Sequence, residues 1–335
     1  TFYFRLIKEE EKNMKIRVIV VLGLAFLLAA VLSAYGAEKG YPRKPIQMVI
    51  PFAAGGDTDI VGRAIAKGAP KYLGQSFAVV NFTGGSGTVG TAEVAKAKPD
   101  GYTVLLAAIG PLTSQPHLND VPYKIPDDFI PVCYLCEFPM VFTVKADAPC
   151  NDVKGWVEWS KKEPKGLIFG QTSGSVLTLT LEEFKLKSGA NMRYVAYNGT
   201  APAVTALLGG HIQAVPAQPA GIAGFVANNQ VKVLAASSAK PIQIAGKTIP
   251  TFKEQGYDIV MTAWNGVLVP KGTPPEIVKK LEEVFWKIST ENDEYKEAMK
   301  KLGQDIVLKN GEEFKAVWLK DYQKFGQIIK AMGKQ

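Results

Sequence analysis

The sequence predicts an α/β protein of two domains, joined by two crossover strands with a cleft between them. Strand-like and helix-like segments alternate in two series, one before and one after residue 150. Such alternation is typical of parallel βαβ units. A late extended segment then returns the chain to the first series. With 335 residues, of which 47% are hydrophobic, the chain can form two cores of ordinary size.

The first series begins after residue 40. Short apolar runs predict its strands, and apolar residues at helical spacing predict its helices. The expected order is strand 46–51, helix 59–73, strand 77–81, helix 89–96, strand 102–107 and extended chain over 127–143.

The second series and the C-terminal part follow the same patterns. The expected order is helix 153–162, strand 167–170, helix 177–188, strand 192–197, helix 202–209, strand 212–216, helix 221–228, strand 231–237, a returning strand over 259–269, and helices 276–290, 294–302 and 312–332.

These elements predict a discontinuous first domain, residues 41–140 and 265–335, with residues 141–264 inserted as a second domain. The chain is expected to cross between the domains at 139–145 and 262–270. Two crossings act as a hinge, and a cleft between hinged domains is a preferred ligand site that can close.

Residues 1–37 have the pattern of a cleavable leader. Met14, expected to be the natural start after residues 1–13, opens a basic segment that is followed by 15 apolar residues, Val18–Leu32. The small residues Ala34, Gly36 and Ala37 then offer a cleavage site. The apolar run is short for a bilayer span, which needs about 20 residues. We therefore expect cleavage and export to the periplasm rather than a membrane anchor.

The charge of the chain argues against binding of nucleic acid. The net charge is +8, of which the five basic and three acidic residues of the leader contribute +2. A mild positive excess suits an anionic ligand, but the Lys residues are spread out, so no nucleic acid partner is expected.

The chain has three cysteines, Cys133, Cys136 and Cys150, and two histidines, His117 and His211. The first two cysteines lie in a strand-like run, where positions three apart point to opposite faces. They are expected to be buried thiols rather than a redox or zinc pair. Each histidine is expected at the surface or in a loop. No metal and no cofactor are predicted.

Two glycine-rich segments, residues 51–59 (PFAAGGDTD) and 83–90 (TGGSGTVG), each follow a predicted strand and precede a predicted helix. Such a turn directs backbone N–H groups and a helix N-terminus at one point, which favours an anion. Thr58 or Asp59 is expected to cap the first of these helices. The alternative is a tight turn with a cap and no ligand. Neither segment has the Lys-Ser/Thr ending of a phosphate loop, which argues against a nucleotide.

The order of these segments resembles the substrate-binding proteins of tripartite tricarboxylate transporters, also called Bug proteins. The resemblance rests on PFAAGGDTDIVGRAIA, on LGQSFAVVNFTGGSGTVGTAEVAKAKPDGYTVLLA, and on residues 170–175, 195–203, 207–210 and 264–275. It implies a two-domain periplasmic-binding-protein fold of the second type. It also implies a monomeric, non-enzymatic receptor that gives a small carboxylate to a membrane permease with one large and one small subunit.

The resemblance also implies the binding residues. The first domain would contribute Phe52, Ala54, Gly55, Gly56, Thr58, Asp59, Gly84, Gly85, Ser86, Gly87 and Thr88. The second domain would contribute Thr172, Ser173, Gly174, Tyr197, Asn198 and Gln218. N–H and hydroxyl donors match an ionised carboxylate, which only accepts hydrogen bonds. The alternatives are helix capping for Thr172 and Ser173 and core packing for Tyr197.

Two departures from the family pattern bear on the ligand. Asp57 stands where a small or neutral residue is more usual, and Ala217-Gln218 replaces an Asp-Asn pair. The second change disfavours an amino acid and favours a di- or tricarboxylate or an aromatic acid, while Asp57 keeps a ligand amine open. Two other functions compete: ligand sensing for a signalling receptor, and an exported hydrolase with His117 or His211 beside a Ser or Asp.

Overall fold

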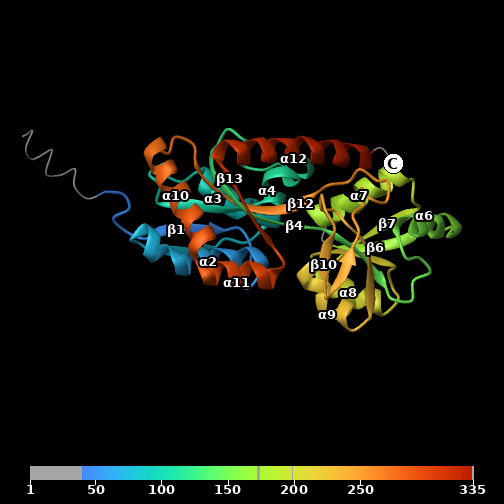
Figure 1. Cartoon of the computed structure of the whole chain (residues 1–335). Helices are drawn as coiled ribbons and strands as arrows, with labels where there is room; N and C mark the ends of the chain where they lie inside the picture. Colours follow the sequence, from blue (N-terminus) through green and yellow to red (C-terminus); the bar gives the residue numbers. More distant parts are fainter. Residues whose placement is uncertain (1–39, 172–173, 198, 334–335) are drawn as a thin grey trace, which may run out of the picture. The chain divides into compact units, whose positions relative to one another are not determined.

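The fold is built on two mixed β-sheets (Figure 1). The computed structural model describes residues 40–171, 174–197 and 199–333, so the predicted leader lies outside the described residues. The described residues from Lys44 onward form one compact unit.

The first sheet has six strands in the order β13-β4-β12-β3-β1-β2. The strands are β1 (Ile46–Ile50), β2 (Phe77–Asn81), β3 (Thr103–Ala108), β4 (Phe129–Pro139), β12 (Thr262–Pro270) and β13 (Asp305–Asn310). Strand β1 pairs in parallel with β2 and β3, and β12 lies antiparallel between β3 and β4. The chain that returns from the second sheet therefore enters the middle of the first.

The second sheet has five strands in the order β7-β6-β8-β5-β9. The strands are β5 (Val141–Lys145), β6 (Leu167–Gln171), β7 (Met192–Ala196), β8 (Ala214–Ala217) and β9 (Val231–Ala236). Strand β6 is parallel to β7 and β8, and β5 is antiparallel to β8 and β9. A hairpin, β10 (Ile242–Ile244) and β11 (Lys247–Ile249), forms a separate two-stranded sheet.

Helices pack around both sheets. Those that follow strands of the first sheet, or lie near the C-terminus, are α2 (Asp57–Leu73), η1 (Gly85–Gly87), α3 (Thr88–Ala95), α4 (Ile109–Thr113), α5 (Gln115–Leu118), α10 (Pro275–Glu291), α11 (Asp293–Leu302) and α12 (Gly311–Met332). Those within the second series are α6 (Val153–Lys162), α7 (Val176–Ser188), α8 (Thr200–Leu208) and α9 (Pro219–Ala227). Helix α12 packs on β4 and also reaches α7 (Figure 1).

The sequence patterns predicted most of these elements to within three residues at either end. The long amphipathic helix over 276–290 buries the expected face, with Leu281, Val284, Phe285 and Ile288 inside. The acidic start of the last helix is a capping box between Asn310 and Glu313. Helices α4 and α5 and strands β10, β11 and β13 were not predicted.

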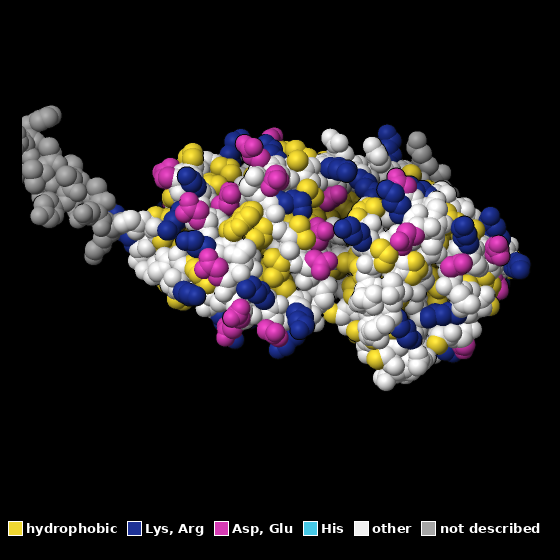
Figure 2. Space-filling view, viewed as in Figure 1, with side chains coloured by type: hydrophobic (Ala, Val, Ile, Leu, Met, Phe, Trp, Pro, Cys, Tyr) yellow, Lys and Arg dark blue, Asp and Glu magenta, His cyan; other side chains and the backbone are white. Residues whose placement is uncertain are grey.

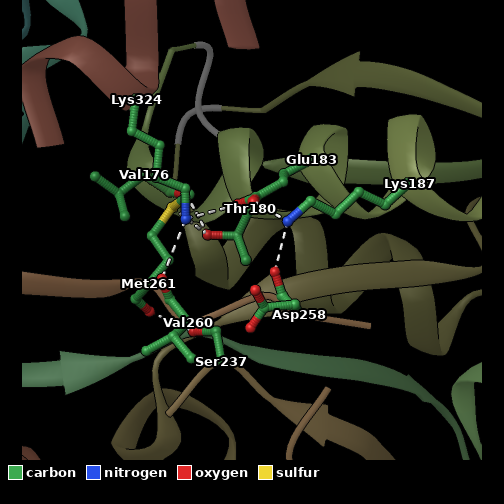
Figure 3. Close-up of polar contacts among 9 residues, drawn as sticks. All are labelled: Val176, Thr180, Glu183, Lys187, Ser237, Asp258, Val260, Met261 and Lys324. Carbon is green, nitrogen blue, oxygen red and sulfur yellow. Dashed lines mark hydrogen bonds and ion pairs between the residues drawn. The ribbon is translucent and has the colours of Figure 1, made fainter. Parts of the chain in front are cut away.

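A polar cluster joins α12 to α7 beside the returning chain (Figure 3). The Lys324 Nζ lies 2.9 Å from Glu183 Oε2 and donates to the Val260 carbonyl at 3.1 Å. The Lys187 Nζ lies 2.8 Å from Glu183 Oε1 and donates to the Asp258 carbonyl. Glu183, only 7% exposed, is therefore neutralised by lysines from both helices.

The two segments that connect the sheets are bridged by Ser237, which follows β9. The Ser237 hydroxyl accepts a hydrogen bond from the Met140 N–H at 2.9 Å. It donates to the Met261 carbonyl (Figure 3). Met140 lies between β4 and β5, and Met261 directly precedes β12. The outgoing and returning connections therefore meet at one hydroxyl.

The cysteines lie where the sequence predicted buried thiols. All three cysteines are free and buried, as expected for structural thiols. No helix in the described ranges is long and apolar enough to cross a membrane. The same residues contain no group of three His, Cys, Asp or Glu able to hold a metal. On the face shown in Figure 2, basic and acidic side chains are interspersed.

Candidate functional site

A cavity of about 720 Å³ is lined by residues from both halves of the fold. This volume is in the range of sites for small molecules. The first-sheet half contributes Phe52, Ala53, Gly56, Asp57, Thr58, Ser86, Ala108, Ile109, Gly110, Gln115, Phe138, Ala263, Trp264 and Asn265. The second-sheet half contributes Gly174, Ser175, Val176, Leu177, Gly199 and Gln218.

Five helices begin at this cavity. Their N-cap residues all line it: Gly56 for α2, Ala108 for α4, Ser175 for α7, Gly199 for α8 and Gln218 for α9. Each helix follows a strand, so the cavity lies at the carboxyl ends of strands from both sheets. Ser175 caps α7 with its side chain, whereas no side chain caps the other four. Uncapped helix N-termini leave N–H groups and partial positive charge toward the cavity.

The first glycine-rich loop is held by Asp59, which does not cap the helix. Helix α2 begins at Asp57, with Gly56 as N-cap and no side-chain cap, so the expected cap by Thr58 or Asp59 is wrong. The Asp59 side chain is 2% exposed and accepts hydrogen bonds from Gly55 N–H at 2.8 Å, Arg63 Nε at 2.8 Å and Asn81 Nδ2 at 2.9 Å.

Burial of Asp59 opposes its ionisation, but the hydrogen bonds from Arg63, Gly55 and Asn81 outweigh that effect. Together they hold the pKa of Asp59 below its ordinary value. The Asp59 carboxylate therefore fixes the loop by accepting a hydrogen bond from the Gly55 N–H. This N–H was predicted to bind the ligand.

The second glycine-rich loop is defined by its backbone. Four consecutive residues, Gly84 to Gly87, have positive φ, including Ser86 at 53°. A Cβ on Gly87 would lie 2.5 Å from Pro111 Cγ and 3.0 Å from Phe52 Cζ. A left-handed conformation is unfavourable for serine, and strain of this kind clusters at functional sites. Ser86 is the residue of this loop that lines the cavity.

Apolar side chains form another part of the wall. They are Ile109, Phe138 and Trp264 from the first half and Val176 and Leu177 from the second. The Trp264 indole N–H donates to Asp321 Oδ2 at 2.9 Å, which fixes the ring at the cavity. Burial raises the pKa of Asp321, and the Trp264 hydrogen bond partly offsets this.

Uncharged polar side chains complete the lining. The Asn265 amide donates to the Ala107 carbonyl at 3.2 Å, and Gln115 Oε1 accepts from the Asn119 amide at 2.9 Å. No Lys, Arg or His occurs among the described residues that line the cavity, and Asp57 is the one acidic side chain among them.

Six of the predicted site residues are in the cavity lining, and eight others are not. The lining contains Phe52, Gly56, Thr58, Ser86, Gly174 and Gln218. It does not contain Ala54, Gly55, Asp59, Gly84, Gly85, Gly87, Thr88 or Tyr197. Thr172, Ser173 and Asn198 lie outside the described residues.

Tyr197 packs instead against the second sheet. It is half-buried beside the hydrophobic cluster that includes Ala203 and Leu207 of α8. A Cβ on Gly170 would come within 2.6 Å of the Tyr197 ring. Tyr197 therefore packs in the core, which was the alternative to a role in ligand binding.

The histidines lie away from the cavity lining. His117 is half-buried in the short helix α5, not in a loop, and its Nε2 lies 2.8 Å from the Tyr322 carbonyl. His211 is exposed, as expected. Among the described lining residues, neither Ser86 nor Ser175 therefore has a histidine beside it.

Two halves with a ligand-sized cavity between them define the class of a two-domain solute-binding protein. Residues 61–334 match the family described as tripartite tricarboxylate transporter family receptor, and the chain belongs to that family. Members are solute-binding receptors and not enzymes. The resemblance found in the sequence and the predicted fold class are confirmed.

Relatives and solved structures agree with this assignment. A UPF0065 protein in the gbd 5′ region of Cupriavidus necator is 31% identical over 307 residues, covering 91% of this chain and 92% of that protein. A TctC solute-binding protein from Polaromonas, solved without ligand, is 36% identical with a TM-score of 0.76, covering 87% of this chain and 100% of the other.

Two further structures are informative. The periplasmic binding protein BugD is 32% identical with a TM-score of 0.72, covering 88% of this chain and 99% of the other. A Rhodopseudomonas palustris protein solved with adipate is 25% identical with a TM-score of 0.75, again covering 88% and 99%.

Proposed function

We propose that this receptor captures a small carboxylate in the cavity and delivers it to a tripartite tricarboxylate-type membrane permease with one large and one small subunit. The observation that carries the proposal is the meeting of five helix starts from both sheets at one cavity. The adipate-bound relative supports a carboxylate as the ligand class.

The lining suits this chemistry. An ionised carboxylate only accepts hydrogen bonds, and uncapped helix starts supply N–H donors together with partial positive charge. The Thr58 and Ser86 hydroxyls add donors from the two glycine-rich loops. Hydrogen bonds to a charged group contribute about 1.5–3 kcal/mol each, so a few converging donors hold an anion without a cationic side chain.

Capture would proceed by closure of two domains, residues 41–140 with 265–335 and residues 141–264, whose second boundary falls within β12 of the first sheet. Beside the cavity, the Ser114 hydroxyl donates to the Gly174 carbonyl at 2.9 Å, which is a contact between the two halves that closure would form. The paired connections at Ser237 suit a hinge. We further propose a monomer that the leader sends to the periplasm, where the relative BugD acts as a binding protein.

A thermal-shift screen with adipate, citrate and benzoate tests the proposal. The protein is first unfolded, dialysed and refolded, and mass spectrometry confirms that no ligand has copurified. A ligand at 100 times its Kd stabilises a protein by about 2.7 kcal/mol, which raises Tm by about 5 °C in a chain of this size.

The matched neutral amides, adipamide and benzamide, serve as controls and are expected to have no effect. If none of the three acids raises the Tm of the ligand-free protein, the proposed function is wrong.

A further inference from the structure

Asp57 lines the proposed ligand site, and its carboxylate has no partner among the described residues. Asp57 is half-buried at the first position of α2 and lines the cavity. Within the described part of the chain it has neither an ion pair nor a side-chain hydrogen bond. Asp59, two residues later, is buried and neutralised by Arg63. The site therefore contains one uncompensated carboxylate.

We propose that Asp57 is a specificity-determining residue that restricts the ligand to carboxylates with no more than one net negative charge. The inference rests on the proposed function. A second or third ligand carboxylate would be repelled by Asp57, and no described lining residue supplies a cation to offset the repulsion. Unfavourable charge pairs of this kind exclude competing ligands.

The helix starts attract every ligand carboxylate, whereas Asp57 repels the one that lies next to it. A helix N-terminus offers about half an elementary charge at its own place in the cavity, and that of α2 already interacts with Asp57 itself. A second ligand carboxylate near Asp57 is therefore disfavoured. A ligand amine would reverse the effect, because an ammonium group is attracted to the same carboxylate that repels an anion. The preferred ligands are therefore monocarboxylates and ω-amino monocarboxylates.

The apolar wall indicates what the rest of the ligand resembles. Phe138 and Trp264 on one side and Val176 and Leu177 on the other suit a hydrocarbon chain or ring. Three acids with the same six-carbon chain differ mainly in the charge at one end. Hexanoate carries one negative charge, adipate carries two, and 6-aminohexanoate is a zwitterion.

A purely structural role for Asp57 is the competing explanation, because an acid in the first turn stabilises a helix. Helix α11 provides a matched control. Asp293 also occupies the first position of its helix, but its side chain is 93% exposed and lines a separate surface depression. Asp57→Asn and Asp293→Asn are thus the same change at the same helix position, inside and outside the site.

Isothermal titration of the three acids into the full-length wild type and both variants tests the proposal. We expect hexanoate and 6-aminohexanoate to bind the wild type more tightly than adipate. Asp57→Asn should raise the adipate-to-hexanoate affinity ratio about tenfold and weaken 6-aminohexanoate. Asp293→Asn should leave all three affinities unchanged.

An unchanged ratio in Asp57→Asn, with the acids still bound, overturns the role of Asp57 and leaves the proposed function standing. Failure of all three acids to bind any of the proteins counts against the proposed function itself, and the inference falls with it. Circular dichroism and Tm verify folding of each variant. If Asp57→Asn does not fold, Asp57→Ser is measured against the same ratio.

Discussion

The two glycine-rich loops that reach the cavity from the first sheet are held by different interactions. The loop after β1 is fixed by a side-chain network, in which the buried Asp59 carboxylate binds the loop N–H of Gly55 and the side chains of Arg63 and Asn81. The loop after β2 is fixed by backbone conformation, with four consecutive positive φ angles and tight packing of Gly87.

Because of this difference, we expect the two glycine-rich loops to respond to different perturbations, although their sequences are similar. A charged network depends on pH and on the partners of one carboxylate. A loop fixed by backbone conformation depends on the volume of its side chains and not on protonation. Three substitutions separate the two cases.

Gly87→Ala is expected to have the largest effect, a loss of about 3 kcal/mol in the free energy of unfolding. The new methyl would be strained at φ 93° and would meet Pro111 and Phe52. Urea unfolding measures the loss, which should be equal at pH 7 and pH 4.

Gly74→Ala is the control for Gly87→Ala, because Gly74 also has positive φ but faces open space. Its loss reports backbone strain alone and should be about 1 kcal/mol. Equal losses for the two variants would show that packing of Gly87 does not hold the second loop.

Asp59→Asn is expected to cost about 2 kcal/mol at neutral pH, because an amide cannot replace a carboxylate that accepts from three donors. The pKa of Asp59 is lowered by folding. Its contribution is therefore complete above the unfolded pKa, about 3.9, and is lost as pH falls through the lower folded pKa.

The stability gap between the wild type and Asp59→Asn should therefore close as pH falls below about 4. Urea unfolding at pH 7, 5 and 3 measures it, with the exposed Asp293→Asn as a variant that should show little gap at any pH. A gap that stays constant down to pH 3 would mean that the charge of Asp59 does not fix the first loop.

Ser86→Gly is expected to have the smallest effect on stability, a gain of about 0.5 kcal/mol. Glycine relieves the strain at φ 53°, and its greater freedom in the unfolded chain offsets part of the gain. Ligand affinity should fall because the hydroxyl leaves the cavity. A loss of stability above 1 kcal/mol would show that the hydroxyl holds the loop.

Local patterns were sufficient for most of the fold. Helix α6 and strand β2 begin and end where hydrophobic periodicity placed them. Helix α4 was missed because Gly110 and Pro111 look like a loop, although its first turn needs no internal N–H donors. Strand β13 was missed because its residues are partly exposed at the sheet edge and pair with β4, which is distant in sequence.

The part of the candidate site that local sequence indicated lies mainly in the two glycine-rich loops. These loops were recognised because their positive φ angles, at Gly55 and at Gly84, Gly85 and Gly87, favour glycine. The apolar wall was not, because Phe138 and Trp264 lie in strands whose pairing brings them together across more than a hundred residues. Asp59 was assigned to the ligand because sequence alone does not show that Arg63 and Asn81 surround it.

The reactivity of the three buried cysteines can be used to measure unfolding of this receptor. Burial raises the pKa of Cys136 to about 12 and of Cys150 to about 11, and it raises that of Cys133 well above its usual range. Disulfides and alkylating reagents react with the thiolate form. The thiols of the native chain are therefore unreactive toward both. Labelling of these sulfurs therefore counts the molecules that have opened, without a dye or an engineered probe.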